Sequence, residues 1–112
     1  MTRLGVVGNK YNARKTYSTL CRRTFDSQAE AVRGEELWIL DKVGAIQELQ
    51  YQVPFILSVK PRIKITLDFV YRENGNLVYE DVKGILTRES RVKLAWLKEK
   101  HGIEVTLYRS QF

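Results

Sequence analysis

The sequence has few of the residues that build disulfide-linked or zinc-linked small folds. Its 112 residues include one cysteine, Cys21, one histidine, His101, and two prolines. A single cysteine excludes an intrachain disulfide and a cysteine-based zinc site, and it is typical of a reducing compartment. No apolar run approaches the roughly 20 residues of a membrane-spanning helix, and the basic N-terminus lacks the apolar stretch of a secretion signal. We therefore expect a cytoplasmic protein with no membrane partner.

The charge of the chain favours a polyanionic partner. Lys and Arg number 19 and Asp and Glu number 13, so the formal net charge is +6. Hydrophobic residues make up 44% of the chain, which is enough for a single packed domain and argues against disorder. A positive field on a small domain favours nucleic acid, and we expect DNA.

The hydrophobic pattern predicts an α/β protein in which a mixed sheet is flanked by two helices. Alternating residues indicate strands, apolar residues three or four positions apart indicate helices, and Pro54 interrupts one strand region. The expected order is β-α-β-β-β-α-β, and the last two strands are parallel if the second helix is a crossover. The predicted elements are a strand at 19–25, a helix at 27–43, one bent strand or two short strands at 46–57, hairpin arms at 62–72 and 77–84, a helix at 88–101 and a strand at 103–108.

The first helix carries a start signal that includes an acidic residue. Ser27 and Glu30 have the spacing of a capping box, and Gly44 follows the helix where glycine is favoured. Capping alone would explain Glu30, with its side chain outside the buried stripe. We expect the buried stripe of this helix to comprise Val32, Leu37, Trp38, Leu40 and Val43.

The hairpin at 62–84 brings charged residues together. Asn74-Gly75 is a strong signal for a two-residue turn, because both central residues of a type I′ turn need positive φ. This turn places Asp68 opposite Asp81, and Lys83 shares the face of Asp81 because strand side chains alternate. Like charges directly opposite each other destabilise a sheet unless a cation lies between them. The alternative is an ordinary solvated face.

A neighbouring acid competes for the same role. Glu80 precedes Asp81 directly, and a one-residue slip of the register would exchange the two and turn every other side chain over. The alternation of apolar residues along the first arm puts Asp68 on the less apolar face. We therefore favour Asp81.

These residues resemble the PD-(D/E)XK nuclease superfamily. The likeness lies in Asp68 in one strand, Asp81-Val82-Lys83 in the next, and Glu30 in the first helix. It is closest to a small phage-encoded, Holliday-junction-resolvase-like branch, in which KYNA, FDSxxEA, an IxDFVY-like strand and EDVKG occur in this order. It covers roughly residues 10 to 108. Leu67 stands where a proline often precedes the first acid.

The resemblance implies a fold and a set of roles. The fold would be a restriction-endonuclease-like core, with residues 1–15 as a basic N-terminal arm and 16–112 as a single domain. Asp68, Asp81 and the backbone carbonyl of Val82 would ligate Mg²⁺ or Mn²⁺, which prefer oxygen ligands. Lys83 would orient the attacking water or stabilise charge on the phosphate. Glu30 would act through a water or a second metal.

Two groups of basic residues are candidates for binding DNA phosphates. One lies in the N-terminal arm, and the other at the start of the helix at 88–101, where the helix N-terminus also favours anions. For both groups the alternative is ordinary solubility. The candidates are Lys10, Arg14, Lys15, Arg88, Arg91 and Lys93.

We therefore expect a metal-dependent DNA endonuclease in phage recombination, replication or repair. Its expected substrate is branched DNA such as a Holliday junction, and symmetric cleavage of a junction would need a homodimer. One alternative is a non-catalytic DNA-binding recombination accessory protein. Another is a nicking or restriction-type nuclease on linear duplex.

Overall fold

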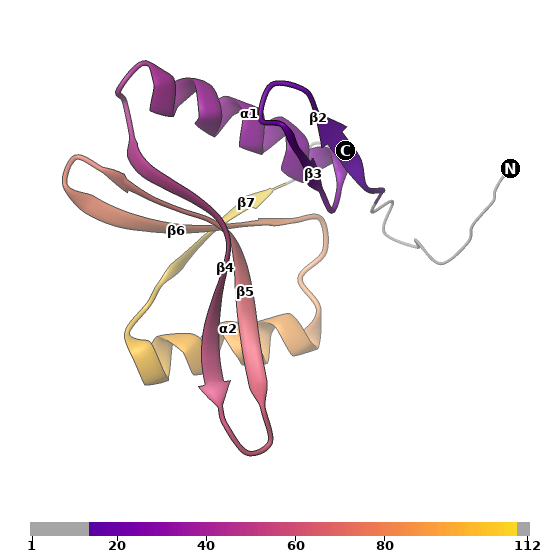
Figure 1. Cartoon of the computed structure of the whole chain (residues 1–112). Coiled ribbons are helices and arrows are strands. Elements are labelled where there is room, and N and C mark those ends of the chain that lie inside the picture. Colours follow the sequence, from indigo (N-terminus) through magenta and orange to yellow (C-terminus); the bar gives the residue numbers. More distant parts are fainter. Residues whose placement is uncertain (1–13, 110–112) are drawn as a thin grey trace, which may run out of the picture.

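The computed structural model describes residues 14–109 and has the expected α/β architecture (Figure 1). A four-stranded mixed sheet has the order β4-β5-β6-β7, with β6 and β7 parallel and the other neighbours antiparallel. A separate two-stranded sheet, β2-β3, precedes the first helix. The elements are β2 (Thr16–Ser18), β3 (Arg23–Phe25), α1 (Gln28–Lys42), β4 (Gln47–Ser58), β5 (Ile63–Glu73), β6 (Asn76–Lys83), α2 (Arg88–His101) and β7 (Val105–Arg109).

The N-terminal part of the fold differs from the prediction of one strand at 19–25. The chain forms two short strands, β2 and β3, around a turn in which Arg22 has a positive φ of 58°. Phe25 points from β3 against α1, where a ring atom would lie only 2.6 Å from a Cβ added at Gly34. The small sheet therefore packs on the first helix and adds no strand to the main sheet.

β4 is one continuous strand of 12 residues, whereas the sequence left open a bent strand or two short ones. Pro54 lies in its ladder opposite Thr66. A proline is tolerated there because β4 is an edge strand and needs hydrogen bonds on one side only. The irregularities fall elsewhere, between Gln47 and Gln50 and between Ile56 and Ser58.

The β5-β6 hairpin has the predicted register. Asn74 and Gly75 have φ values of 53° and 82°, as a type I′ turn requires, and Glu73 pairs with Asn76. The ladder between the two strands ends at Phe69 and Glu80. Beyond that pair, the first half of β5 pairs with β4 only and the end of β6 with β7 only. The two strands thus diverge, as their crossing directions in Figure 1 show.

Both helices begin after an N-cap residue with a side-chain hydroxyl. The hydroxyls of Ser27 and Thr87 each accept a backbone N–H three residues later, at 3.0 and 3.1 Å. On α1 the buried residues include Ala31, Gly34 and Leu37. The prediction that Val32 and Val43 belong to this stripe is wrong, because they are 40% and 71% exposed.

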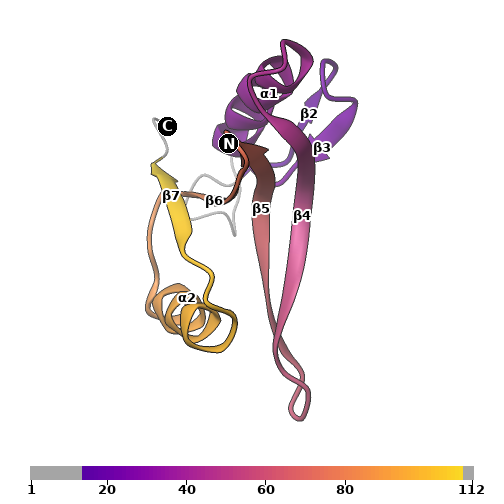
Figure 2. The ribbon, with the colours of Figure 1, turned by 90° about the vertical axis from the view of Figure 1, so that its left-hand side faces the viewer.

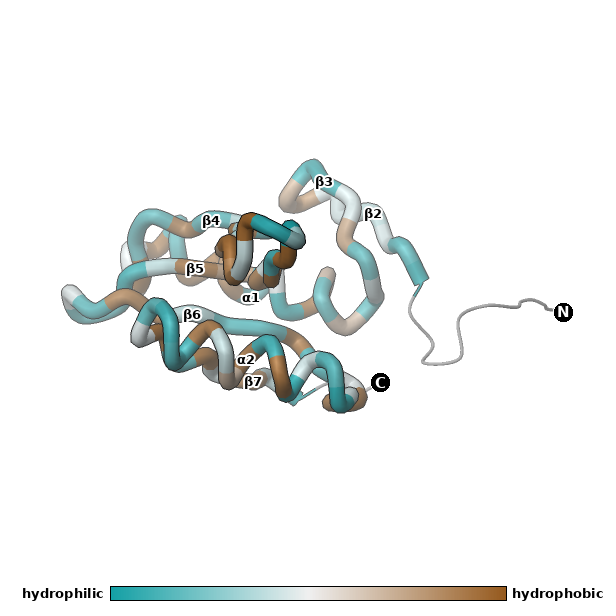
Figure 3. Tube along the Cα trace, turned by 90° about the horizontal axis from the view of Figure 1, so that it is seen from below, coloured by the Kyte–Doolittle hydropathy of each residue, from teal (hydrophilic) through white to brown (hydrophobic). Residues whose placement is uncertain are grey.

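The fold has two hydrophobic clusters, and between them lies the place where β5 and β6 diverge beyond Phe69 and Glu80, which we call the strand fork. One lies under α1 and includes Phe25, Leu37 and Phe69, and the other lies under α2 and includes Leu67 and Leu97. The helices lie at opposite ends of the long β4-β5 hairpin, with β6 and β7 passing between them (Figures 1 and 2). Much of β5 is apolar, which fits its place inside the sheet (Figure 3).

Candidate active site

The two predicted carboxylates meet where β5 and β6 diverge. The backbone N–H of Asp68 donates to Oδ1 of Asp81 at 3.1 Å, and the backbone N–H of Val82 donates to Oδ2 of Asp68 at 2.8 Å. Each side chain thus accepts from the backbone of the other strand just beyond the last pair of their ladder. This exchange holds the acids together, as the hairpin register predicts.

Lys83 completes the group on β6. Its Nζ lies 3.0 Å from Oδ2 of Asp81, and its side chain is 26% exposed while that of Asp81 is only 4% exposed. The amine therefore sits between a buried acid and solvent. Two carboxylates and one ammonium group converge on one place, as the sequence indicates.

Glu30 reaches the same site from the first turn of α1. Its backbone N–H donates to Ser27, as in a capping box, but its carboxylate accepts from the Nε2 amide of Gln52 at 2.7 Å. The residue is only 5% exposed, so the prediction that it lies outside the buried face is wrong. The side chain of Glu30 faces the sheet because Gln52 of β4 donates a hydrogen bond to it.

Gln52 is a member of the site that the sequence did not single out. It lies on β4 between two residues that pair with the neighbours of Asp68 on β5, and its Nε2 is 3.2 Å from Oδ1 of Asp68. One amide thus connects Glu30 with Asp68. Its backbone has a positive φ of 52°, which is uncommon for a residue other than glycine. The alternation of Gln50 and Gln52 with apolar residues is the one sequence signal that could have indicated this position.

Burial and mutual repulsion make the acids hard to ionise together. Burial is the main cause that raises the pKa of Asp68 well above its usual range, and its hydrogen bond with Asp81 and the charges of Asp81 and Glu30 raise it further. Burial likewise raises the pKa of Glu30 from its ordinary value near 4.5 to about 7, with added repulsion from Asp26 and Asp81. With all its acids ionised, the site would carry more negative charge than it can accommodate, so at neutral pH it favours a bound proton or a cation.

Glu80, the competing acid, points to the other side of β6. Its carboxylate accepts from Nε of Arg33 at 2.6 Å and from Nη2 of Arg33 at 3.0 Å, and the hydroxyl of Tyr71 donates to it at 2.7 Å. The residue is 1% exposed. These contacts occupy Glu80 fully, so the register favours Asp81 as the second acid of the site.

A polar groove extends from Asp81 and Lys83 toward α2. Its cavity has a volume of about 490 Å³ and joins the first half of β5, the end of β6 and the first two turns of α2. The groove is lined by Lys64, Ile65, Thr66, Asp81, Lys83, Thr87, Glu89, Ser90, Lys93 and Leu94. It places three lysines and a helix N-terminus beside the buried acid.

The predicted phosphate-binding residues fall in different places. Lys93 lines the groove, where its Nζ pairs with Glu89 at 3.3 Å. Arg88 and Arg91 are exposed on the same helix. Arg14 and Lys15 are exposed near β2, and Nζ of Lys15 lies 3.1 Å from Asp26. The remaining candidate, Lys10, lies outside the described residues.

The donors at the fork fit a hard divalent cation. Within residues 14–109, no three His, Cys, Asp or Glu side chains are grouped as a ready metal cage. Mg²⁺, however, usually binds through one or two carboxylates and keeps several waters. The carboxylates of Asp68 and Asp81 match that requirement, and the pKa of Asp68 is raised by burial and then by the negative charges of Asp81 and Glu30.

The chain belongs to the family described as Protein of unknown function (DUF1064), whose model matches residues 8–110. No curated protein and no solved structure gives a significant match. Of the helices in the described part of the chain, neither has the length and apolar character needed to cross a membrane.

Proposed function

We propose that this protein is a metal-dependent DNA endonuclease that hydrolyses phosphodiester bonds. The observation that carries the proposal is the pair of carboxylates at the strand fork, with Lys83 3.0 Å from the buried acid Asp81. Two neighbouring acids beside one amine, with Asp81 buried and Asp68 half-buried, repel each other without a cation, so they are poorly explained as a stabilising device. The likeness of Asp68 and Asp81-Val82-Lys83 to the PD-(D/E)XK nucleases supports the same activity.

The likeness to the PD-(D/E)XK nucleases gives each residue of the site a role. Asp68 and Asp81, with the carbonyl of Val82, would hold Mg²⁺ or Mn²⁺. When bound, the metal ion supplies polarisation of the phosphoryl group and a water that ionises near neutral pH. Lys83 would orient the attacking water and offset negative charge that develops on the phosphate. Glu30, whose pKa is raised to about 7, would accept a proton from a water in the site.

The groove beside α2 would position the DNA backbone. Lys64 and Lys93 line it, and the N-terminus of α2 attracts anions. Arg88 and Arg91 on the same helix, and the basic arm with Lys10, Arg14 and Lys15, would extend the contact along the substrate. Branched DNA, a homodimer and a role in phage recombination, replication or repair follow from the likeness to junction-resolving nucleases.

Cleavage of defined DNA structures tests the proposal. Labelled four-way junction, linear duplex and single strand are incubated with the protein and Mg²⁺ or Mn²⁺. The Asp81→Asn and Lys83→Ala variants should lose cleavage by more than a thousandfold, an order of magnitude typical for catalytic groups, and still bind DNA. Glu104→Gln and Lys98→Ala are the matched controls, because these residues form an exposed ion pair.

The same assay distinguishes the alternatives. Binding of all three substrates without any metal-dependent cleavage would refute the enzyme and favour a DNA-binding accessory protein. Cleavage of linear duplex in preference to the junction would favour a nicking or restriction-type nuclease. Cleavage that both substituted proteins retain would show that the acids at the fork are not the active site.

A further inference from the structure

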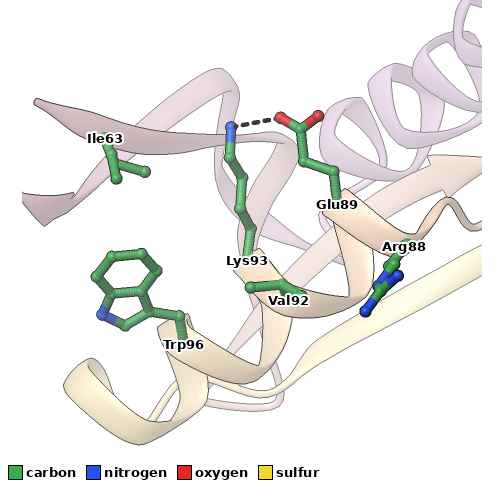
Figure 4. A pocket seen from close by; sticks show the side chains of 6 residues that line it. All are labelled: Ile63, Arg88, Glu89, Val92, Lys93 and Trp96. Atoms are coloured by element: carbon green, nitrogen blue, oxygen red, sulfur yellow. Dashed lines mark ion pairs between the residues drawn. The ribbon is translucent and has the colours of Figure 1, made fainter.

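A second cavity, which is apolar, adjoins the polar groove on α2. It has a volume of about 530 Å³ and is lined by Ile63, Arg88, Glu89, Val92, Lys93 and Trp96. Figure 4 shows Ile63 of β5 facing Trp96 across it, with Val92 one turn earlier on the helix. Val92 is 56% exposed, so this apolar surface is not closed off by the fold. The proposed nuclease chemistry does not use it.

The two cavities share a boundary. Glu89 and Lys93 line both of them, and their side chains form an ion pair at 3.3 Å (Figure 4). The groove on one side of this pair holds Asp81 and Lys83, and the apolar cavity lies on the other side. A ligand that spans the boundary would therefore place one part near the acids and the next part against Trp96.

We propose that the apolar cavity binds an unpaired nucleobase of the DNA, next to the phosphate held in the polar groove. This deepens the proposed nuclease function and rests on it for the identity of the polymer. A base has flat apolar faces, and stacking on an aromatic ring is tolerant of sequence. Cationic groups at the edge of the cavity, on Arg88 and Lys93, suit the phosphates on either side of that base.

The substrate class follows from this geometry. In a paired duplex each base is stacked between its neighbours, and an enzyme reaches it only when the nucleotide leaves the stack. The cavity therefore favours DNA that carries an unpaired nucleotide beside the bond to be cleaved, as at a bulge, a flap or a branch point. Fully paired linear duplex would leave the cavity unfilled.

The charge around the cavity favours nucleic acid over a second copy of the chain. A symmetric dimer with this face as its interface would bring Arg88 and Lys93 of both copies into one interface. Like charges brought together across an interface are disfavoured. Glu89 offsets only one of the two cations, because it is paired with Lys93.

Fluorescence of Trp96 provides a direct measurement. The chain has two tryptophans, so Trp38→Phe leaves Trp96 as the single reporter. This protein is titrated, in EDTA to prevent cleavage, with three hairpin DNAs of equal charge: one fully paired, one with an extrahelical thymine, and one with an abasic site at that position. We expect the thymine to quench Trp96 and to tighten binding roughly 5- to 100-fold over the abasic DNA, as loss of one stacked base implies.

Matched valine substitutions test the location. Val92→Gln, made in the Trp38→Phe protein, should bring the thymine and abasic affinities together. Val32→Gln, the same change at an exposed position of α1, should leave the preference intact. Equal binding of the thymine and abasic DNAs by the parent protein would overturn the inference. A Val92→Gln protein that keeps the preference would also overturn the inference. The same conclusion would hold if sedimentation showed that this protein had lost a dimer while the preference remained.

The outcome is separable from that of the proposed function. Because the titration is done without metal, a preference for the extrahelical thymine would support the cavity even if no cleavage were found. Metal-dependent cleavage that is equally fast with the thymine and abasic DNAs would retain the nuclease and reject the base-binding cavity.

Discussion

Two adjacent acids on β6 lie in opposite environments. Glu80 is buried against α1 and accepts three hydrogen bonds, two from Arg33 and one from Tyr71. Asp81 points to the other face and shares its surroundings with Asp68, while Lys83 is the cation that pairs with it. Both acids are at most 3% exposed, so burial alone does not separate them.

The difference lies in how far the fold neutralises the charge around each acid, because Lys83 pairs with Asp81 beside two further acids, Glu30 and Asp68. Arg33 matches the carboxylate of Glu80 with two N–H groups, an arrangement that favours a structural ion pair. That hydrogen bonding is the main cause that raises the pKa of Arg33 above its usual range. At the fork, burial and then the neighbouring Asp81 and Glu30 instead raise the pKa of Asp68. We infer that Glu80 stabilises the folded protein and that Asp81 binds a ligand.

The largest expected effect concerns the stability of the Glu80 environment. Glu80→Ala leaves Arg33 half-buried without its main partner, and breaking a buried pair in this way costs about 3–5 kcal/mol in unfolding free energy. Chemical denaturation measures this loss. Replacing both partners, as Arg33→Leu with Glu80→Leu, should cost less than the two single changes added together. An additive result would contradict the interpretation of Glu80 as a structural acid.

Asp81→Asn should weaken metal binding and leave stability largely unchanged, whereas Glu80→Ala lowers stability. The change removes the charge that repels Glu30 and Asp68, which offsets the loss of the ion pair with Lys83, so the metal-free protein should unfold at about the same denaturant concentration. Its affinity for Mn²⁺ should fall by roughly a hundredfold or more, because even groups that only support a metal ligand contribute 10- to 100-fold. Calorimetric titration with Mn²⁺ measures the affinity. Unchanged Mn²⁺ binding would remove Asp81 from the metal site.

The stability of the metal-free protein should fall as pH rises. The pKa values of Glu30 and Asp68 are raised in the folded protein. Between the ordinary and the raised pKa, these two side chains keep protons in the folded protein that they have already released in the unfolded chain. The stabilisation is complete below the ordinary pKa near 4.5 and decreases as pH rises through about 7 and beyond. Denaturation at pH 5 and pH 8 measures the slope.

Two changes should flatten this pH dependence. Asp68→Asn removes the larger of the two shifts, and saturating Mn²⁺ favours the ionised carboxylates. Glu80→Gln is the contrasting variant and should keep the slope, although it lowers stability throughout. A metal-free protein that gains stability between pH 5 and pH 8 would refute the crowding of charge at the fork.

The smallest expected effect belongs to Gln52. Its amide connects Glu30 with Asp68, and removing such hydrogen bonds costs about 1 kcal/mol. Gln52→Ala should therefore weaken Mn²⁺ binding by several-fold, with a comparable small loss of stability. Gln50→Ala, an exposed neighbour on the same strand, is the control. Equal effects of both changes would show that Gln52 has no special place at the site.

Local patterns in the sequence determined much of the frame of this protein. The turn at Asn74-Gly75 and the alternation along β5 set the register, which follows from the requirement for positive φ and from the period of a strand. Ser27 and Thr87 set where the helices begin. These signals act over a few residues, and they were sufficient to bring Asp68, Asp81 and Lys83 to one face.

The tertiary structure decided which polar groups complete each environment. Arg33 reaches Glu80 across 47 positions of the chain, and Gln52 reaches Glu30 across 22. The divergence of β5 and β6, which opens the site, depends on their separate pairing with β4 and β7. Such partnerships depend on how distant elements pack and twist, and no local spacing in the sequence encodes them.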